Sequence, residues 1–146
     1  MTEAYINLPG EGESYWAVGA KGTIKGPSVY ELENPGGWEV PLHVHDEEDE
    51  VHYYLEGEVE VTCGDETFKG QPGSLMFLPR GIPHALRFTD AGPGRWLWIS
   101  PRNRDGLFRE AGVSTSQPEP AEEDLDMEAI IGVFEKNGMR FLEQDH

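Results

Sequence analysis

The sequence predicts an all-β domain, a sandwich or a barrel, followed by one C-terminal α-helix. Gly (18) and Pro (11) make up about a fifth of the 146 residues, which favours short strands joined by many turns. From about residue 15 to residue 100, short β-rich runs alternate with turn sequences such as NPGG, QPG, RGIP and AGPG. Several closely spaced short strands are typical of a sandwich or a barrel. The length suits a single domain with its own core.

The runs that we expect to form strands are SVYELE, PLHVH, EVHYYLEG, EVEVTC, ETFKG, SLMFLP, HALRF and RWLWIS. Within VTCGDETF, Gly64 and Asp65 predict a tight hairpin, because a two-residue turn needs residues that accept a positive φ. Cys63 then lies at a strand end, without a basic neighbour to activate its thiol, and we interpret it as structural. Because it is the only cysteine, an intramolecular disulfide framework and a thiolate metal cluster are excluded.

The pattern changes after residue 100. NRDGLFREAG predicts one short helical turn ended by Gly112, and STSQPEPAEED is a polar, acidic connector. Four apolar residues then fall on one face at helical spacing: Met127, Ile130, Ile131 and Phe134. Asp126 suits the N-cap and the pair Asn137-Gly138 suits the C-terminus. We expect the apolar face to pack on the outside of the barrel, with a partner-binding face as the alternative.

Charge restricts the partners. The formal net charge is −17, with only 11 Lys and Arg, so both nucleic acid and an anionic membrane surface would be repelled. The N-terminus has no basic region followed by an apolar stretch, and no segment approaches 18 consecutive apolar residues. We therefore expect a cytoplasmic protein whose partner is a small molecule.

Histidine and acidic residues gather in HVHDEEDEVH, residues 43–52. On a strand, residues two apart point to the same side at a separation of roughly 6.5–7 Å, so His43 and His45 can reach one ion, although a structural pair explains them equally well. If the strand that follows the turn pairs antiparallel with the strand of His43 and His45, the Glu50 carboxylate lies near these two imidazoles. His84 follows a second turn rich in Gly and Pro and opens another β run. Three metal ligands can therefore converge, and His84 is a candidate fourth.

These residues sit at the positions of two spaced motifs. Gly37, His43, His45, Glu50 and Gly57 match the first motif, and Gly73, Pro79, Gly81 and His84 match the second. The arrangement resembles the cupin superfamily, except that Phe88 replaces the asparagine with which the second motif ends. The resemblance implies a cupin β-barrel, also described as a double-stranded β-helix or jelly roll. On that basis we divide the single domain into an N-terminal strand segment (1–26), a barrel core (27–100), a connector (101–124), and a C-terminal helix and tail packed on the barrel (125–146).

The resemblance also implies one divalent metal ion bound by His43, His45, Glu50 and His84. Three imidazoles and one carboxylate suit Fe, Mn, Ni, Co, Cu or Zn and do not choose among them. Four protein ligands leave one or two positions on an octahedral ion for substrate, water or dioxygen, as a catalytic site requires.

Strand alternation directs His52, two residues beyond Glu50, toward the barrel interior. We consider a role beside the metal or on the substrate, a buried structural role, and direct ligation, and we place Glu50 and His52 as the candidate catalytic pair. The acidic turn over residues 46–49 is interpreted as solvated. The residues expected to line the substrate pocket are His52, Tyr54, Phe77, Leu86, Phe88, Trp96 and Trp98. The same aromatic and aliphatic side chains could instead fill a ligand-free core.

The whole chain is similar to small one-domain cupins grouped with quercetin dioxygenases, which share a segment like GLFRE after the last strand and a terminal helix followed by an ending like GMRFL. This similarity implies an oxygen-using dioxygenase that acts on a small aromatic or enediol-type, flavonol-like substrate, with Glu50 as ligand and proton acceptor. One alternative is a non-oxidative isomerase, cyclase or decarboxylase that uses the metal as a Lewis acid, and another is a small-ligand binding module. We expect a homodimer.

Overall fold

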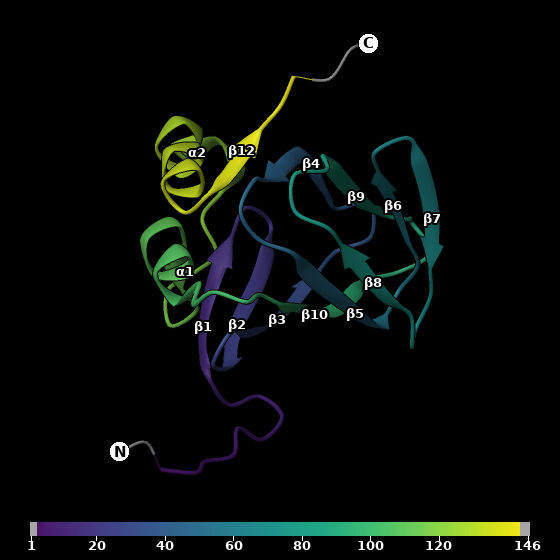
Figure 1. The fold of residues 1–146 in the computed structure, drawn as a ribbon. Coiled ribbons are helices and arrows are strands. Elements are labelled where there is room, and N and C mark those ends of the chain that lie inside the picture. The colour runs from purple at the N-terminus through teal and green to yellow at the C-terminus, as the bar shows by residue number, and fades with distance from the viewer. Residues whose placement is uncertain (1–2, 144–146) are drawn as a thin grey trace.

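The computed structural model describes residues 3–143 as two antiparallel sheets with short helices at one side (Figure 1). The strands of the first sheet are β1 (Glu13–Ala17), β2 (Ala20–Gly26), β3 (Val29–Asn34), β5 (Glu50–Glu56), β8 (Leu75–Leu78), β10 (Gly94–Ile99) and β11 (Val113–Ser114), in the order β11-β1-β2-β3-β10-β5-β8. The strands of the second sheet are β4 (Glu39–His45), β6 (Val59–Cys63), β7 (Glu66–Gly70), β9 (His84–Phe88) and β12 (Met139–Phe141), in the order β12-β4-β9-β6-β7. Neighbours distant in sequence, such as β3 with β10 and β4 with β9, produce a jelly roll of the cupin type, and the predicted all-β fold class is confirmed.

The hairpin expected at VTCGDETF is confirmed. Strands β6 and β7 pair from Val59 opposite Gly70 to Cys63 opposite Glu66, which leaves two residues at the turn. Gly64 has a φ of +61° there, a conformation that favours glycine. Burial raises the pKa of the Cys63 thiol, in keeping with a structural thiol.

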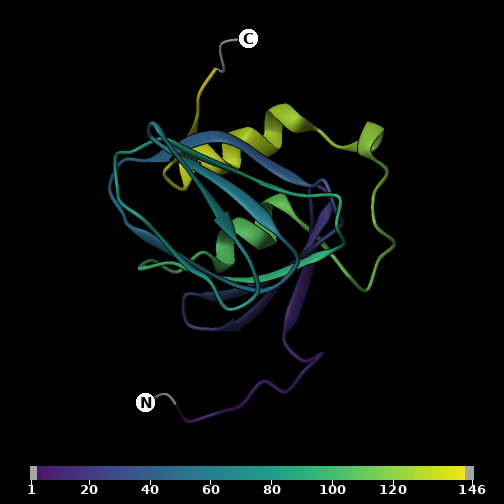
Figure 2. The ribbon, with the colours of Figure 1, turned by 90° about the vertical axis from the view of Figure 1, so that its right-hand side faces the viewer.

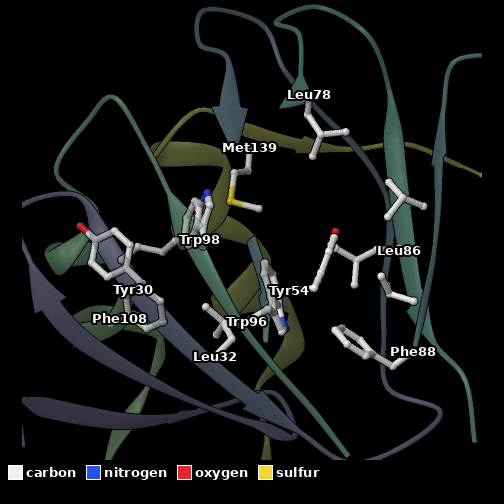
Figure 3. Close-up of a cluster of buried hydrophobic side chains, with 13 residues drawn as sticks. Tyr30, Leu32, Tyr54, Leu78, Leu86, Phe88, Trp96, Trp98, Phe108 and Met139 are labelled. Atoms are coloured by element: carbon white, nitrogen blue, oxygen red, sulfur yellow. The ribbon is translucent and has the colours of Figure 1, made fainter. Parts of the chain in front are cut away.

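The core lies between the inner faces of the two sheets. Tyr54 and Trp96 from one sheet meet Leu86 and Phe88 from the other, and all four are at most 4% exposed (Figure 3). The alternation of buried and exposed positions along β3, β5, β9 and β10 turns one face of each strand inward. The interior of the barrel is therefore packed with aromatic and aliphatic side chains.

The C-terminal part adds α1 (Asp105–Ala111), a single 3-10 turn (Glu122–Asp124) and α2 (Met127–Lys136). The predicted helix is confirmed, and the Asp126 carboxylate caps it by accepting a hydrogen bond from the Ala129 backbone N–H at 3.1 Å. Its apolar face is only partly covered, because Ile130 is buried while Met127 is 41% exposed. The first helical segment is longer than the single turn expected, since α1 spans seven residues.

The chain then returns to the barrel as β12, which the sequence analysis did not expect. This strand pairs with β4, so that Met139 lies opposite His45 and Phe141 opposite His43. Both helices lie beside β1 and β12, on the side of the barrel away from β6 and β7 (Figures 1 and 2). The segment 1–26 contributes β1 and β2. Residues 144–146 of the expected tail lie outside the described residues, and within residues 3–143 no helix is long and apolar enough to cross a membrane.

Candidate metal centre

Four side chains that the sequence predicts as ligands lie together inside the barrel. His43 and His45 are on β4, Glu50 begins β5 and His84 begins β9. The register of β4 with β9 places His43 directly opposite His84. One potential ligand atom from each of the four residues lies within 4.8 Å of the others, and each residue is at most 5% exposed. The two motifs converge because strand pairing brings together segments that are about forty residues apart.

The three imidazole rings are oriented by contacts at Nδ1. His43 Nδ1 lies 2.8 Å from the carbonyl oxygen of Pro41, and His84 Nδ1 lies 3.4 Å from that of Ile82. His45 Nδ1 lies 3.4 Å from Oε1 of Glu48. Backbone carbonyl oxygens face Nδ1 of His43 and His84, so we assign the proton there, which leaves Nε2 of these two rings with a lone pair for a metal ion; His45 Nδ1 makes no hydrogen bond.

The Nε2 atoms of His45 and His84 make no hydrogen bond, although both are buried and lie 3.1 and 2.9 Å from the Glu50 carboxylate oxygens. Lone pairs that face a carboxylate repel it unless a cation, either a proton or a metal ion, lies between them. Burial, followed by the nearby His84, lowers the pKa of His43 to about 3, so this ring is neutral at physiological pH, as a metal ligand must be. The residues therefore fit one divalent transition-metal ion.

Glu50 is held on both of its oxygens. Trp98 donates its Nε1–H to Oε2 at 3.1 Å, and His52 Nε2 lies 3.1 Å from Oε1. Burial alone would raise the pKa of Glu50, but the imidazoles of His45, His52 and His84 outweigh that effect and hold it well below its ordinary value. A carboxylate with so low a proton affinity is suited to ligation and is a weak general base near neutral pH.

His52 contacts the ligand Glu50 and lies outside the group of four. It is 3% exposed, and its Nδ1 lies 3.0 Å from the hydroxyl of Tyr54. Its ring also packs against Trp96, with a centroid distance of 4.7 Å. A hydrogen-bonded chain thus runs from Glu50 through His52 to Tyr54. Burial raises the pKa of the Tyr54 hydroxyl. The arrangement places a group that can both accept and donate a proton beside the candidate metal site.

Glu48 corrects the interpretation of the acidic turn as solvated. Its side chain is 5% exposed and forms an ion pair with Arg104, which is 3% exposed. Arg104 also donates from its guanidinium to the carbonyl oxygen of Asn137, and its backbone N–H donates to the Tyr30 hydroxyl. The turn can bury one acid because a cation from the segment after β10 compensates it. No pattern local to residues 46–49 indicates this partner.

The remaining pocket candidates occupy the core. Tyr54, Leu86, Phe88, Trp96 and Trp98 belong to the buried cluster between the sheets (Figure 3). All five side chains are buried, and which of them border a substrate stays a prediction.

The expectation that Phe77 lines the pocket is wrong, since this side chain is 52% exposed on the outer side of β8. Strand alternation turns its neighbours Met76 and Leu78 inward instead. A hollow of about 280 Å³ borders the site and is lined by Asp49, Glu50, Val51, Arg80, Ile99, Ser100 and Pro101.

Comparison with known proteins agrees with this fold. Residues 29–100 match the family model described as Cupin domain, and both candidate metal motifs lie within that segment. A search of curated proteins finds no match. The match covers just under half of the chain, and together with the structures described next it identifies a cupin fold around the buried candidate metal site.

Three solved structures illustrate the likeness. An RmlC-like cupin from Shewanella frigidimarina NCIMB 400 has a TM-score of 0.59 and 19% identity, over 72% of this chain and 96% of that one. KdgF from Halomonas sp. has a TM-score of 0.57 and 18% identity, over 72% and 99%. A formate complex of oxalate decarboxylase from Lactobacillus farciminis has a TM-score of 0.52 and 18% identity, over 68% and 34%. At these identities the likeness concerns the fold.

Proposed function

We propose that this chain is a metal-dependent enzyme that acts on a small molecule. The observation that carries the proposal is the buried set of three imidazoles and one carboxylate, in which two Nε2 atoms have no hydrogen-bond partner. When bound, a divalent ion would supply Lewis acidity and open coordination positions. The complete ligand set favours an enzyme over a pure binding module, and the net charge of −17 favours a small-molecule partner over nucleic acid or an anionic membrane.

The finer proposal is a dioxygenase that uses an aromatic or enediol-type substrate, similar to flavonols. Such substrates carry an acidic hydroxyl group whose proton must be removed. We assign this step to His52, whose Nε2 lies beside Glu50 and whose Nδ1 contacts the Tyr54 hydroxyl. Glu50, with its low pKa, remains a ligand. Motif resemblance to quercetin dioxygenase-like cupins supports the oxygen-using variant.

A second candidate is a non-oxidative isomerase, cyclase or decarboxylase. The hydrogen-bonded pair of His52 and Tyr54 favours it, because such reactions need a proton to be removed from one atom and returned to another. The two candidates share the metal site and the proton-carrying residues, and they differ in whether dioxygen is consumed.

Oxygen uptake tests the finer proposal. Protein purified without a His tag is loaded separately with Fe, Mn, Ni, Co, Cu or Zn and mixed with flavonols and other aromatic enediols in an oxygen electrode. Uptake that depends on both metal and substrate supports the dioxygenase, and its absence with every metal and substrate contradicts it. Product formed at the same rate under anaerobic conditions would select the non-oxidative candidate. The His52→Gln variant, with its metal content verified, should lose most of the activity under either candidate.

A further inference from the structure

The C-terminal segment, residues 137–142, lies along the half of β4 that carries two of the candidate metal ligands (Figure 1). Its strand β12 pairs with β4 directly opposite His43 and His45. The pairing continues beyond β12, where the Leu142 backbone N–H donates a hydrogen bond to the carbonyl oxygen of Leu42 at 3.0 Å. Because β4 has only β12 beyond it in this sheet, the segment covers backbone groups that would otherwise form a sheet edge.

On its other side, the same half of β4 is paired less regularly. The register of β4 with β9 shifts between Val40 and His43. Pro41 lies within this interval and has no backbone N–H to donate to a neighbouring strand. The C-terminal segment, in contrast, pairs without interruption from His45 to His43. The backbone that carries both imidazoles is therefore aligned in large part by this segment.

Side chains of the C-terminal segment reach the site as well. The ring of Phe141 packs on the imidazole of His43, with a centroid distance of 5.7 Å. Phe141 also contacts Phe134 of α2 at a centroid distance of 5.5 Å. Met139, between the two ends of the segment, is buried. One candidate ligand is thus connected through the segment to the C-terminal helix.

A second connection to the site runs through the buried side chain of Arg104. Its guanidinium pairs with Glu48 and donates to the carbonyl oxygen of Asn137, where the C-terminal segment begins. Oε1 of Glu48 lies 3.4 Å from Nδ1 of the candidate ligand His45. Since Arg104 and Glu48 are at most 5% exposed, water does not replace either partner of the guanidinium. One buried cation therefore contacts both the acid beside a ligand and the start of the segment.

We propose that Arg104 is a positioning residue that couples docking of the C-terminal segment to metal binding. The docked segment holds His43 and His45 in place as ligands, and a bound metal ion in turn holds the segment on β4. The coupling is reciprocal: docking raises metal affinity by the same factor by which the metal favours docking, commonly about 5–150-fold. This inference rests on the metal site of the proposed function and does not depend on the reaction that the site catalyses.

Hydrogen exchange of the whole chain, with and without one equivalent of Zn²⁺, tests the coupling; another of the six candidate metals is used should Zn²⁺ not bind. The metal should slow exchange of the β12 amides by at least ~5-fold, because exchange there requires the segment to leave β4. Strand β7 is the internal control, since it is the opposite edge of the same sheet, and its exchange should change by less than ~2-fold. A segment with a structural role alone would exchange at the same rate in both samples.

The variant Arg104→Met tests the connecting residue. Its dissociation constant for the metal, measured by chelator competition, should rise by about 10–100-fold, the usual effect of losing a residue that orients a ligand. The metal-dependent protection of β12 should fall below ~2-fold in this variant. Arg109→Met is the matched control, because Arg109 belongs to the neighbouring helix α1 and pairs with Glu13 at the surface. It should keep the wild-type affinity and the wild-type protection.

Should Arg104→Met not fold, Leu142→Pro tests the same coupling. Proline removes the N–H that Leu142 donates to Leu42 and leaves the pair of Arg104 and Glu48 in place. The dissociation constant for the metal should rise by at least ~5-fold.

Two kinds of outcome separate this inference from the metal site itself. Metal binding by wild type without slower exchange at β12, or wild-type metal affinity in a folded Arg104→Met or in Leu142→Pro, would overturn the coupling alone. Failure of wild type to bind any of the six candidate metals would overturn the metal site and the coupling together.

Discussion

Replacing Glu48 with glutamine should destabilise the metal-free protein by about 3–5 kcal/mol, the usual cost of removing one partner from a buried ion pair. Glu48 and Arg104 are 5% and 3% exposed, so the variant leaves a guanidinium charge in the interior without its carboxylate. At about 2–4 °C per kcal/mol for a chain of this size, the melting temperature should fall by roughly 10 °C. Urea unfolding and calorimetry measure both quantities.

Glu47→Gln is the control, because Glu47 is 76% exposed and pairs with Arg102 at the surface, where such a pair contributes at most about 1 kcal/mol. The metal affinity of Glu48→Gln should also fall by about 10–100-fold, since Glu48 faces Nδ1 of the ligand His45 at 3.4 Å. Competition with a chelator measures that affinity. A Glu48→Gln variant within 1 kcal/mol of wild type, or one no less stable than Glu47→Gln, would refute the reasoning about the buried pair.

Three further predictions concern the same site. In the folded protein His43 has a pKa of about 3, whereas in the unfolded chain it has its ordinary pKa of 6.5, so the unfolded chain binds more protons between these values. The free energy of unfolding of the metal-free protein should therefore fall by ~2–3 kcal/mol between pH 7.5 and about pH 4.5 in urea titrations. His43→Gln should make this free energy less dependent on pH. The depressed pKa of Glu50 acts in the same direction, because the unfolded state again binds more protons. Trp98→Phe removes the donor to Glu50 Oε2 and should weaken metal binding by about tenfold in chelator competition without loss of fold. Met139→Ala, at a buried position opposite His45, should cost about 2–4 kcal/mol in thermal unfolding, and a cost under 1 kcal/mol would show that β12 is dispensable.

His84, about forty residues along the chain from His43, was assigned through the resemblance to the second cupin motif. The sequence predicted the fold class and the other three candidate ligands because these depend on short-range patterns. Period-two alternation and turn residues specify strands, and the spacing from His43 to Glu50 leaves room for only one turn between two strands. The hairpin at Gly64 and the cap at Asp126 followed from equally local chemistry. Each of these features is determined by residues that are near one another in the chain.

The sequence did not predict features that depend on contacts between distant segments or on strands that are apolar on both faces. Alternation could not orient Phe77, because β8 is apolar at every position. The burial of Glu48 depends on Arg104, which lies in another segment and carries no local sign of its partner. Strand β12 is only three residues long, and its partner β4 lies far away in the sequence. Tertiary context determined the outcome in all three cases.

Metal content is the measurement that tests the central claim most directly. Wild type purified without a His tag, and His43→Ala/His84→Ala prepared in parallel, are analysed by elemental mass spectrometry after loading and desalting. We predict one equivalent of a divalent transition metal in wild type and none in the double variant, while His52→Gln keeps its full equivalent because His52 lies outside the four ligands. Failure of wild type to retain any of the six metals, or full retention by the double variant, would contradict the assignment of this site.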